Sequence, residues 1–201
     1  MKKLLLIAAL WGCLSALLAE PAASLPAERQ RAYFKVYDRI ALAMVQQRKE
    51  LIPEMMKEMS RLGEAGDLRA AFEYAMYHSG AVDYEKGCAM AGKLFPELLN
   101  LAKKDDWRAC QAVGMCYAYG MGCKRDNTAA DRWTEKSRKL MQKAAANDDP
   151  VAMLEQAFHT LMMGSAPKEA EALLHRLKKY DSKFAEYVLE KIAEEKKRSG
   201  K

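Results

Sequence analysis

The chain of 201 residues has little of what a β-sheet protein needs. Aromatic residues make up 8% of it, and it holds 11 glycines and 6 prolines. Ala, Leu, Lys, Glu and Met dominate where Val, Ile and Thr would be needed to build strands. Half of the residues are hydrophobic and 30% are charged, a balance that excludes a disordered or collagen-like chain. The composition therefore predicts a globular, all-helical protein.

The sequence also lacks the patterns that carry catalysis. It has no glycine-rich phosphate loop, no G-x-S-x-G motif and no cysteine placed with a histidine base. The acidic pairs Asp105–Asp106 and Asp148–Asp149 stand where a helix needs a cap, which explains them without chemistry. We therefore expect no enzyme, no catalytic residue and no cofactor.

A metal site is not expected either. There is no H-x3-H or C-x2-C spacing, so zinc is disfavoured, and the three histidines are isolated at His78, His159 and His175. The 13 methionines could indicate copper, but they fall mainly on apolar stripes, where methionine fills a core.

Long hydrophobic runs are absent except at the start of the chain. Met1-Lys2-Lys3 precedes an uncharged apolar run, Leu4–Leu18, and Ala19-Glu20-Pro21 follows it. The run is too short to span a bilayer and has the three parts of a secretory signal peptide. We predict a signal peptide over 1–19, cleaved near Ala19 with a site up to Ala23 as an alternative, and a periplasmic or secreted protein.

Cys13 suggests an alternative in which the same segment is the signal sequence of a lipoprotein. Leu10-Trp11-Gly12-Cys13 is similar to a bacterial lipobox, which would make the chain a lipoprotein. The apolar stretch continues past the cysteine to Leu18, however, where a lipoprotein normally turns polar. Cleavage near Ala19, with loss of Cys13, is the favoured interpretation.

The excess of positive charge is small. The net charge is +6, and the one dense basic run, Lys196–Arg198, follows Glu194 and Glu195 at a terminus, as in a solvated helix end. Nucleic-acid binding is therefore not expected. No later segment is apolar enough to cross a membrane.

Helical periodicity begins in the segment 20–63. Tyr33, Tyr37, Ile40 and Met44 form the stripe of an amphipathic helix expected from Pro26 to about Leu51. Pro53 can open a second, shorter helix. Residues 20–63 are thus predicted to be a helical lead-in.

A pattern of Asp, two residues, Ala, four residues and a small residue then occurs three times. Its members are Asp67, Ala70 and Ala75; Asp106, Ala109 and Gly114; and Asp149, Ala152 and Ala157. The spacings of 39 and 43 residues lie in the range of paired-helix repeats. Each Asp is expected to cap a first helix, and glycines at Gly80, at Gly120 and Gly122, and at Gly164 are expected to turn the chain into a second helix. We predict repeats near 67–104, 105–147 and 148–180 and a capping helix over 182–197, within a repeat region 64–201.

The middle repeat resembles a known family. The pattern A-x4-G-x2-Y-x2-G-x-G-V-x2-D-x2-A-x3-W of the Sel-1-like repeat, a tetratricopeptide-like helical hairpin, is matched at Ala109, Gly114, Tyr117, Gly120, Gly122, Asp126, Ala129 and Trp133. Cys123 replaces the usual valine, and the resemblance is specific only for 105–152. It implies a short right-handed solenoid of antiparallel helix pairs, with lead-in helices before it and a capping helix after it.

Four cysteines follow the signal peptide: Cys88, Cys110, Cys116 and Cys123. An oxidising compartment allows disulfides. The resemblance to the Sel-1-like repeat implies disulfides that join neighbouring repeats. Cys110 with Cys116 is disfavoured, because residues six apart lie about 9 Å apart along a helix. We favour Cys88 with Cys110 and Cys116 with Cys123. The alternative is that some of these are buried free thiols.

The resemblance implies binding rather than catalysis. Paired-helix repeats present first helices on a concave surface, where exposed aromatic residues anchor a protein or peptide. Trp107, Arg108 and Tyr119 are the candidate partner-binding residues. We expect a non-catalytic scaffold or adaptor for an unidentified protein or peptide. The alternative is a periplasmic thiol-redox or copper-binding module built on Cys110, Cys116 and Cys123.

Overall fold

The computed structural model describes residues 27–163 and 167–199. Helices contain 85% of these residues and strands none, so the prediction of an all-helical fold is confirmed. In this part of the chain, no helix is both long and apolar enough to cross a membrane. The predicted signal peptide and Cys13 lie outside the described residues, as does the turn expected at Gly164.

Nine α-helices and two short 3-10 helices follow one another in the described residues. They are α2 (Ala27–Val45), η1 (Lys49–Leu51), α3 (Ile52–Glu64), α4 (Leu68–Ala81), α5 (Tyr84–Lys103), α6 (Trp107–Tyr119), α7 (Asn127–Ala146), α8 (Pro150–Met162), α9 (Pro167–Leu177), η2 (Lys178–Tyr180) and α10 (Lys183–Arg198).

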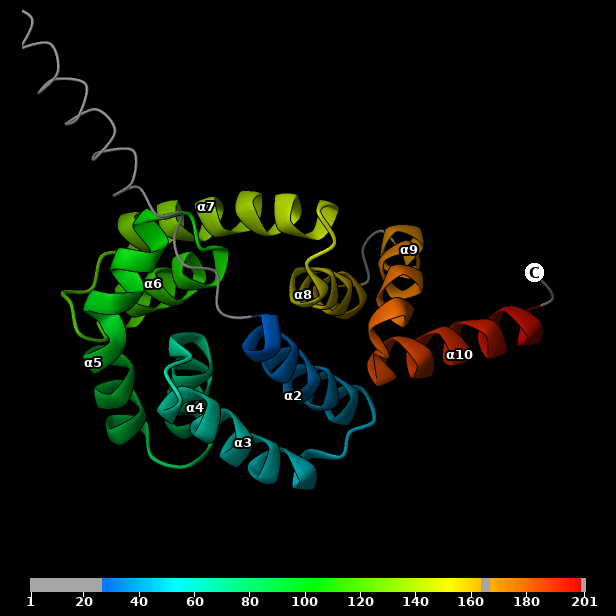
Figure 1. The fold of residues 1–201 in the computed structure, drawn as a ribbon, viewed down its shortest axis with the longest axis horizontal. Coiled ribbons are helices and arrows are strands. Elements are labelled where there is room, and N and C mark those ends of the chain that lie inside the picture. The colour runs from blue at the N-terminus through cyan, green and yellow to red at the C-terminus, as the bar shows by residue number, and fades with distance from the viewer. Residues whose placement is uncertain (1–26, 164–166, 200–201) are drawn as a thin grey trace, which may run out of the picture.

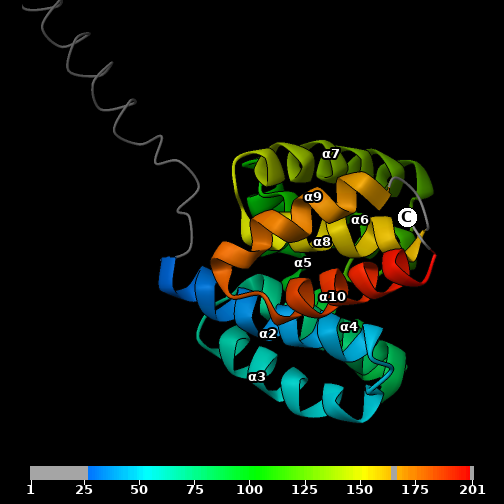
Figure 2. The same cartoon turned by 90° about the vertical axis from the view of Figure 1, so that its right-hand side faces the viewer.

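The helices form an arc around α2. Each helix from α3 to α10 packs against its neighbours in sequence, with α3, α5 and α7 outside, α4, α6 and α8 inside and α2 at the centre (Figure 1). Seen from the side, α7 and α3 lie at opposite edges of the molecule (Figure 2). The core has two parts, one around α2, α8, α9 and α10 and one among α4, α5 and α6.

The entries into α4, α6 and α8 are built alike. In each, the aspartate side chain predicted as a cap accepts backbone N–H groups of the first turn, at 2.9 to 3.3 Å. The residue before each cap is left-handed, with φ of +93° at Gly66, +64° at Asp105 and +65° at Asp148. The backbone N–H of each cap donates to the carbonyl five residues earlier, which closes the preceding helix. Capping by Asp67, Asp106 and Asp149 is thus confirmed.

Asp105 and Asp148 each form an ion pair with a basic residue of the outer helix that follows. Lys136 of α7 lies 2.7 Å from Asp105 and donates to the Ala102 carbonyl at 2.9 Å. Arg176 of α9 likewise pairs with Asp148 and donates to the Ala145 carbonyl at 2.7 Å. Ala102 and Ala145 each stand three residues before their aspartate, so the same polar tie joins α7 to one junction and α9 to the next.

Some predicted boundaries differ from the observed ones. The first helix ends at Val45 rather than near Leu51, because the chain turns through a left-handed Gln47 into η1. Gly80 does not turn the chain; it lies inside α4, and the turn comes at Val82 and Asp83. Other expected helix starts are close to the observed ones, including that of α10 behind its Ser182 cap.

The residues that match the repeat pattern have visible packing roles. Gly120 ends α6 in the left-handed conformation, with φ +73°. Gly122 has φ +71°, and a Cβ there would lie 2.4 Å from the carbonyl oxygen of Gly92. Tyr117 packs edge-on against Phe95 at 5.5 Å, and Asp126 caps α7. The two glycines therefore permit a left-handed turn pressed against α5.

The first and last described helices are tied together by a buried carboxylate. Asp38 of α2 accepts hydrogen bonds from the Ser182 hydroxyl and from the backbone N–H groups of Lys183 at 2.8 Å and Phe184 at 3.4 Å. Asp38 therefore satisfies backbone donors of the first turn of α10 from another helix. This contact closes the arc.

Candidate functional site

A cleft opens between α4 and α6 on the inner side of the arc. Its lining residues occupy equivalent positions on the two helices, two, five, six and nine residues after the capping aspartate. They are Arg69, Phe72, Glu73 and Met76 on α4 and Arg108, Gln111, Ala112 and Met115 on α6. Glu155, again six residues after its cap, contributes from α8, and Tyr37 contributes from α2. The cavity has a volume of about 200 Å³.

The two arginines of the cleft already have carboxylate partners. Arg69 lies 3.3 Å from Asp67 and 3.8 Å from Asp106. Arg108 lies 3.9 Å from Asp149. Each guanidinium thus reaches from its own helix to the cap of the next inner helix, which links α4, α6 and α8 in series.

Arg108 is also held by aromatic rings. Its guanidinium lies 4.5 Å from the centre of the Tyr33 ring and 4.8 Å from that of Trp107. Such cation–π contacts strengthen when water is excluded, and Arg108 is only 7% exposed. Its Nε has no hydrogen-bond partner in the described structure. The side chain is therefore held between two rings, and its Nε–H is a buried donor without a partner in the described residues.

The two glutamates of the cleft have no such cation. Among the described residues, no Lys, Arg or His nitrogen lies within 4.0 Å of the Glu73 or Glu155 carboxylate. Burial and, after it, the charge of Glu155 raise the pKa of Glu73 to about 7, although Arg108 offsets part of the rise. Glu73 is thus partly protonated near neutral pH, unlike an exposed glutamate.

Glu155 is held in position by polar neighbours. The Tyr37 hydroxyl donates a hydrogen bond to its Oε2, and the Gln111 amide donates to its Oε1 at 3.5 Å. Burial, followed by the charges of Glu155 and Glu73, raises the pKa of Tyr37 well above its ordinary value. Tyr37 therefore keeps its proton and remains a donor to Glu155.

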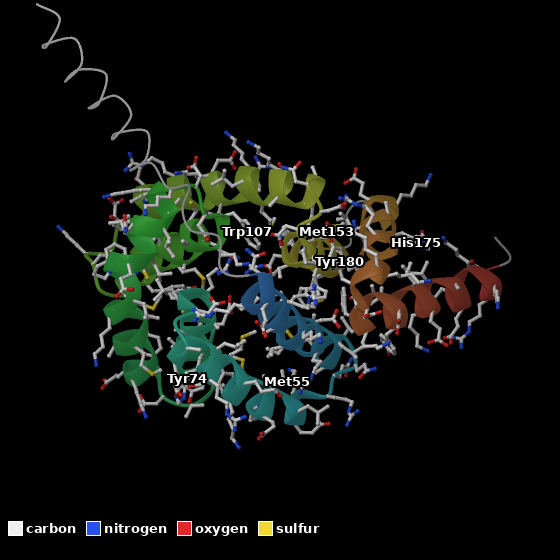
Figure 3. All side chains as sticks on the ribbon, in the orientation of Figure 1. Met55, Tyr74, Trp107, Met153, His175 and Tyr180 are labelled. Atoms are coloured by element: carbon white, nitrogen blue, oxygen red, sulfur yellow. The ribbon has the colours of Figure 1, made fainter. Side chains whose placement is uncertain are left out.

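The three predicted partner-binding residues do not share an exposed surface. Trp107 is 7% exposed and points into the interior (Figure 3), and its carbonyl accepts a hydrogen bond from Ser137 at 2.7 Å. Arg108 is equally buried but lines the cleft, whereas Tyr119, at the other end of α6, is 60% exposed. Trp107 is therefore a core residue, Arg108 a cleft residue and Tyr119 a surface residue.

The structure does not support the pairing of Cys88 with Cys110. All four cysteines of the described chain are free thiols. The Cys110 thiol donates to the Ala102 carbonyl near the end of α5, at 3.5 Å, whereas Cys88 lies near the beginning of α5, about 21 Å away along the helix. A disulfide needs the two Cα atoms within about 7 Å.

Cys116 and Cys123 flank the Gly120–Gly122 turn. They lie close enough that a charge on Cys123 adds to burial in raising the pKa of Cys116 to about 12. Burial also raises the pKa of Cys110 to about 11 and that of Cys123 in the same direction. These thiols are protonated at neutral pH and are poor nucleophiles. Their pairing stays a prediction.

Over the described ranges, no group of three or more His, Cys, Asp or Glu side chains is placed to hold a metal ion. The three histidines lie on different helices, His78 on α4, His159 on α8 and His175 on α9. In the described structure, the cleft is therefore the place where apolar and polar side chains from several helices meet.

Most of this cleft was not predicted from the sequence. Glu73, Glu155 and Arg69 were not singled out, although their distances from the capping aspartates could have indicated them. Residues at equal distances from equivalent caps point in the same direction on successive helices. Tyr37 carried no such signal, because its place depends on the packing of α2 at the centre of the arc.

Comparison with known proteins adds no identification. No protein-family model matches the chain. No solved structure matches it.

Proposed function

We propose that the chain is an exported, non-catalytic repeat protein of the Sel-1-like kind that binds a peptide or a peptide segment of another protein in the cleft between α4 and α6. Its helix pairs α4–α5, α6–α7 and α8–α9 would form a short right-handed solenoid, with α2 and α3 as the lead-in and α10 as the cap. The predicted signal peptide supports the assignment to the periplasm or the exterior.

One observation carries this proposal. The cleft is lined by equivalent positions of successive inner helices, as a binding surface made by stacked repeats would be. Its lining combines an apolar part, Phe72, Met76 and Met115, with hydrogen-bonding groups on Gln111 and Glu73. Binding sites typically combine an apolar lining with a few placed polar groups.

The size of the cleft supports a peptide over a small molecule. A volume of about 200 Å³ is below the roughly 300–1,000 Å³ typical of sites that enclose a drug-sized ligand. The cleft can therefore receive one or two side chains while the rest of the ligand lies outside. Exposed Tyr119 remains a candidate contact for a larger partner.

The alternative function, a thiol-redox or copper-binding module, has less support. Redox-active cysteines are accessible and have a lowered thiol pKa. Cys110 and Cys116 are buried, and their pKa values are raised. We therefore assign Cys110 to packing, and we keep the predicted disulfide between Cys116 and Cys123 as a structural bond.

Ala112→Gln tests the site directly. The substitution places a longer side chain in the cleft, at the position where α4 and α8 carry Glu73 and Glu155. Peptides selected from a displayed random library on the mature chain, lacking residues 1–19, should bind Ala112→Gln at least tenfold more weakly, a loss of about 1.4 kcal/mol. Fluorescence anisotropy measures the affinity, and circular dichroism checks the fold.

Ala172→Gln is the matched control, because Ala172 is exposed on α9, away from the cleft. It should bind the selected peptides as the unmodified chain does. If Ala112→Gln also binds them unchanged, the cleft is not the binding site and this proposal is wrong.

A further inference from the structure

We propose that the cleft recognises a basic side chain, lysine or arginine, of the bound peptide, with its cationic group between Glu73 and Glu155. This inference rests on the proposed function and names the chemistry of the ligand. Two carboxylates line the cleft from two different helices, and in the described structure neither has a basic partner within 4.0 Å.

A carboxylate removed from water without a partner is costly, and a cation that pairs with it recovers part of that cost. Glu73 is mostly buried, and no hydrogen bond to its carboxylate is present in the described residues. Glu155 accepts hydrogen bonds from Tyr37 and Gln111 but is not neutralised by them. The chain itself thus lines the cleft with two carboxylates, and in the described residues neither of them forms an ion pair within 4.0 Å.

The neighbouring arginines do not fill this role. Arg69 and Arg108 lie beside the capping aspartates, within 4 Å of Asp67, Asp106 or Asp149. The immediate surroundings of the cleft therefore hold two cations and five carboxylates. The partial positive charge of a helix N-terminus balances a cap but fades within the first turn, and the glutamates lie six residues, or about 9 Å, further along their helices.

The rest of the lining suits the stem of such a side chain. Phe72, Met76, Ala112 and Met115 present apolar surface. Lysine and arginine bury their methylene stems on apolar surface and keep the charged end near polar groups. Methionine adapts its shape to the group that it contacts. The space of about 200 Å³ fits one extended side chain.

Binding of a cation beside Glu73 should depend on pH. Glu155 and Arg108 are the charged groups that act on Glu73. Tyr33 and Tyr37 of α2 also lie near it. No charged group of α3 or α5 in the described residues shifts the pKa of Glu73. Since the pKa of Glu73 is about 7, the bound cation must displace a proton below that pH. Affinity should therefore rise from pH 6 to pH 8 and then level off.

Methyl NMR can test the inference with defined probes. The mature chain is labelled with ¹³C-methyl methionine, and the signals of Met76 and Met115 are assigned with leucine variants. Nα-acetyl-arginine N-methylamide should shift both signals in a saturable way. The citrulline analogue, which has nearly the same shape and no charge, should bind at least tenfold more weakly.

Glu73→Gln and Glu155→Gln should each weaken the arginine probe at least tenfold, and Glu73→Gln should abolish the pH dependence. Glu97→Gln, the same change at an exposed site on α5, is the control and should bind as the unmodified chain does. Equal shifts by arginine and citrulline probes, or no shift by either, would overturn the inference. Preferential binding of acetyl-leucine with a free carboxylate would also overturn it and would point to Arg69 and Arg108.

The peptides selected for the previous test separate this inference from the proposed function. If Ala112→Gln weakens their binding but neither glutamate variant does, the cleft binds peptides without recognising a basic side chain. Only the inference about the basic side chain then fails. If Ala112→Gln has no effect on the peptides, the proposed function fails regardless of the probes.

Discussion

Glu73 shows how far the surroundings of one residue decide its chemistry. It occupies the position equivalent to Ala112 and Glu155 on the other two inner helices, and the charge of Glu155, which lines the same cleft, acts on it. The sequence shows the spacing from the cap but not the curvature that brings α4 and α8 toward the same space. A raised pKa at Glu73 could therefore not be predicted from the sequence.

Because the pKa of Glu73 is raised, the stability of the folded chain should depend on pH. A glutamate with a higher pKa in the folded chain favours folding at low pH, and this contribution is lost as the pH rises from about 4.5 to 7. Glu73→Gln should remove that loss. Between pH 5 and pH 8, the free energy of unfolding should fall by on the order of 2 to 3 kcal/mol more in the unmodified chain than in the variant.

Urea unfolding followed by circular dichroism at the two pH values measures this difference. Glu97→Gln should keep the pH dependence of the unmodified chain. An unchanged pH dependence in Glu73→Gln would mean that the Glu73 carboxyl has an ordinary pKa.

Among the elements, helix starts were the most predictable. The caps Asp67, Asp106 and Asp149 were recognised because a side-chain acceptor followed by an apolar stripe is a local signal. Gly80 was misplaced as a turn because a single glycine also fits inside a helix, at a cost of about 1 kcal/mol. Short sequence patterns thus predicted where the helices begin, whereas the packing of the helices against one another could be seen only in the structure.

Helix α6 shows, within one element, which features can be predicted from the sequence and which cannot. Trp107 and Tyr119 lie at opposite ends, and their aromatic character alone did not tell a core residue from a surface residue. Trp107→Ala should lower the free energy of unfolding by about 3 to 5 kcal/mol, because it leaves a cavity beside Arg108. Tyr119→Ala should change it by less than about 0.5 kcal/mol.

Thermal and urea unfolding of the two variants test this contrast. A small effect of Trp107→Ala would contradict the buried position of the indole ring. A large effect of Tyr119→Ala would show that its ring is packed rather than exposed.

At the scale of the molecule, the arc is closed by contacts between the two ends of the described chain. The sequence predicted a lead-in and a cap but placed them at opposite ends of a stack. Asp38 instead joins α2 to α10 through Ser182, Lys183 and Phe184. Contacts across such a separation in sequence leave no local pattern, so this closure was not predictable.

Asp38→Ala should open this closure. It leaves the Ser182 hydroxyl and two backbone N–H groups without their acceptor, at an expected cost of about 2 to 3 kcal/mol. Hydrogen exchange should become faster at the start of α10 and in α2, with less change in α5 and α7. Asp131→Ala, at an exposed position on α7, should leave exchange unaltered, and unaltered exchange in Asp38→Ala would show that the tie does not hold the ends together.

The central position of α2 also bears on how the chain folds. Its partners α8 and α10 come long after it in the sequence, so α2 cannot complete its packing until α10 has been synthesised. Folding steps that depend on such distant partners are slow. The inner helices would therefore stay exposed along one side until α10 has been synthesised, which would suit the export that we propose.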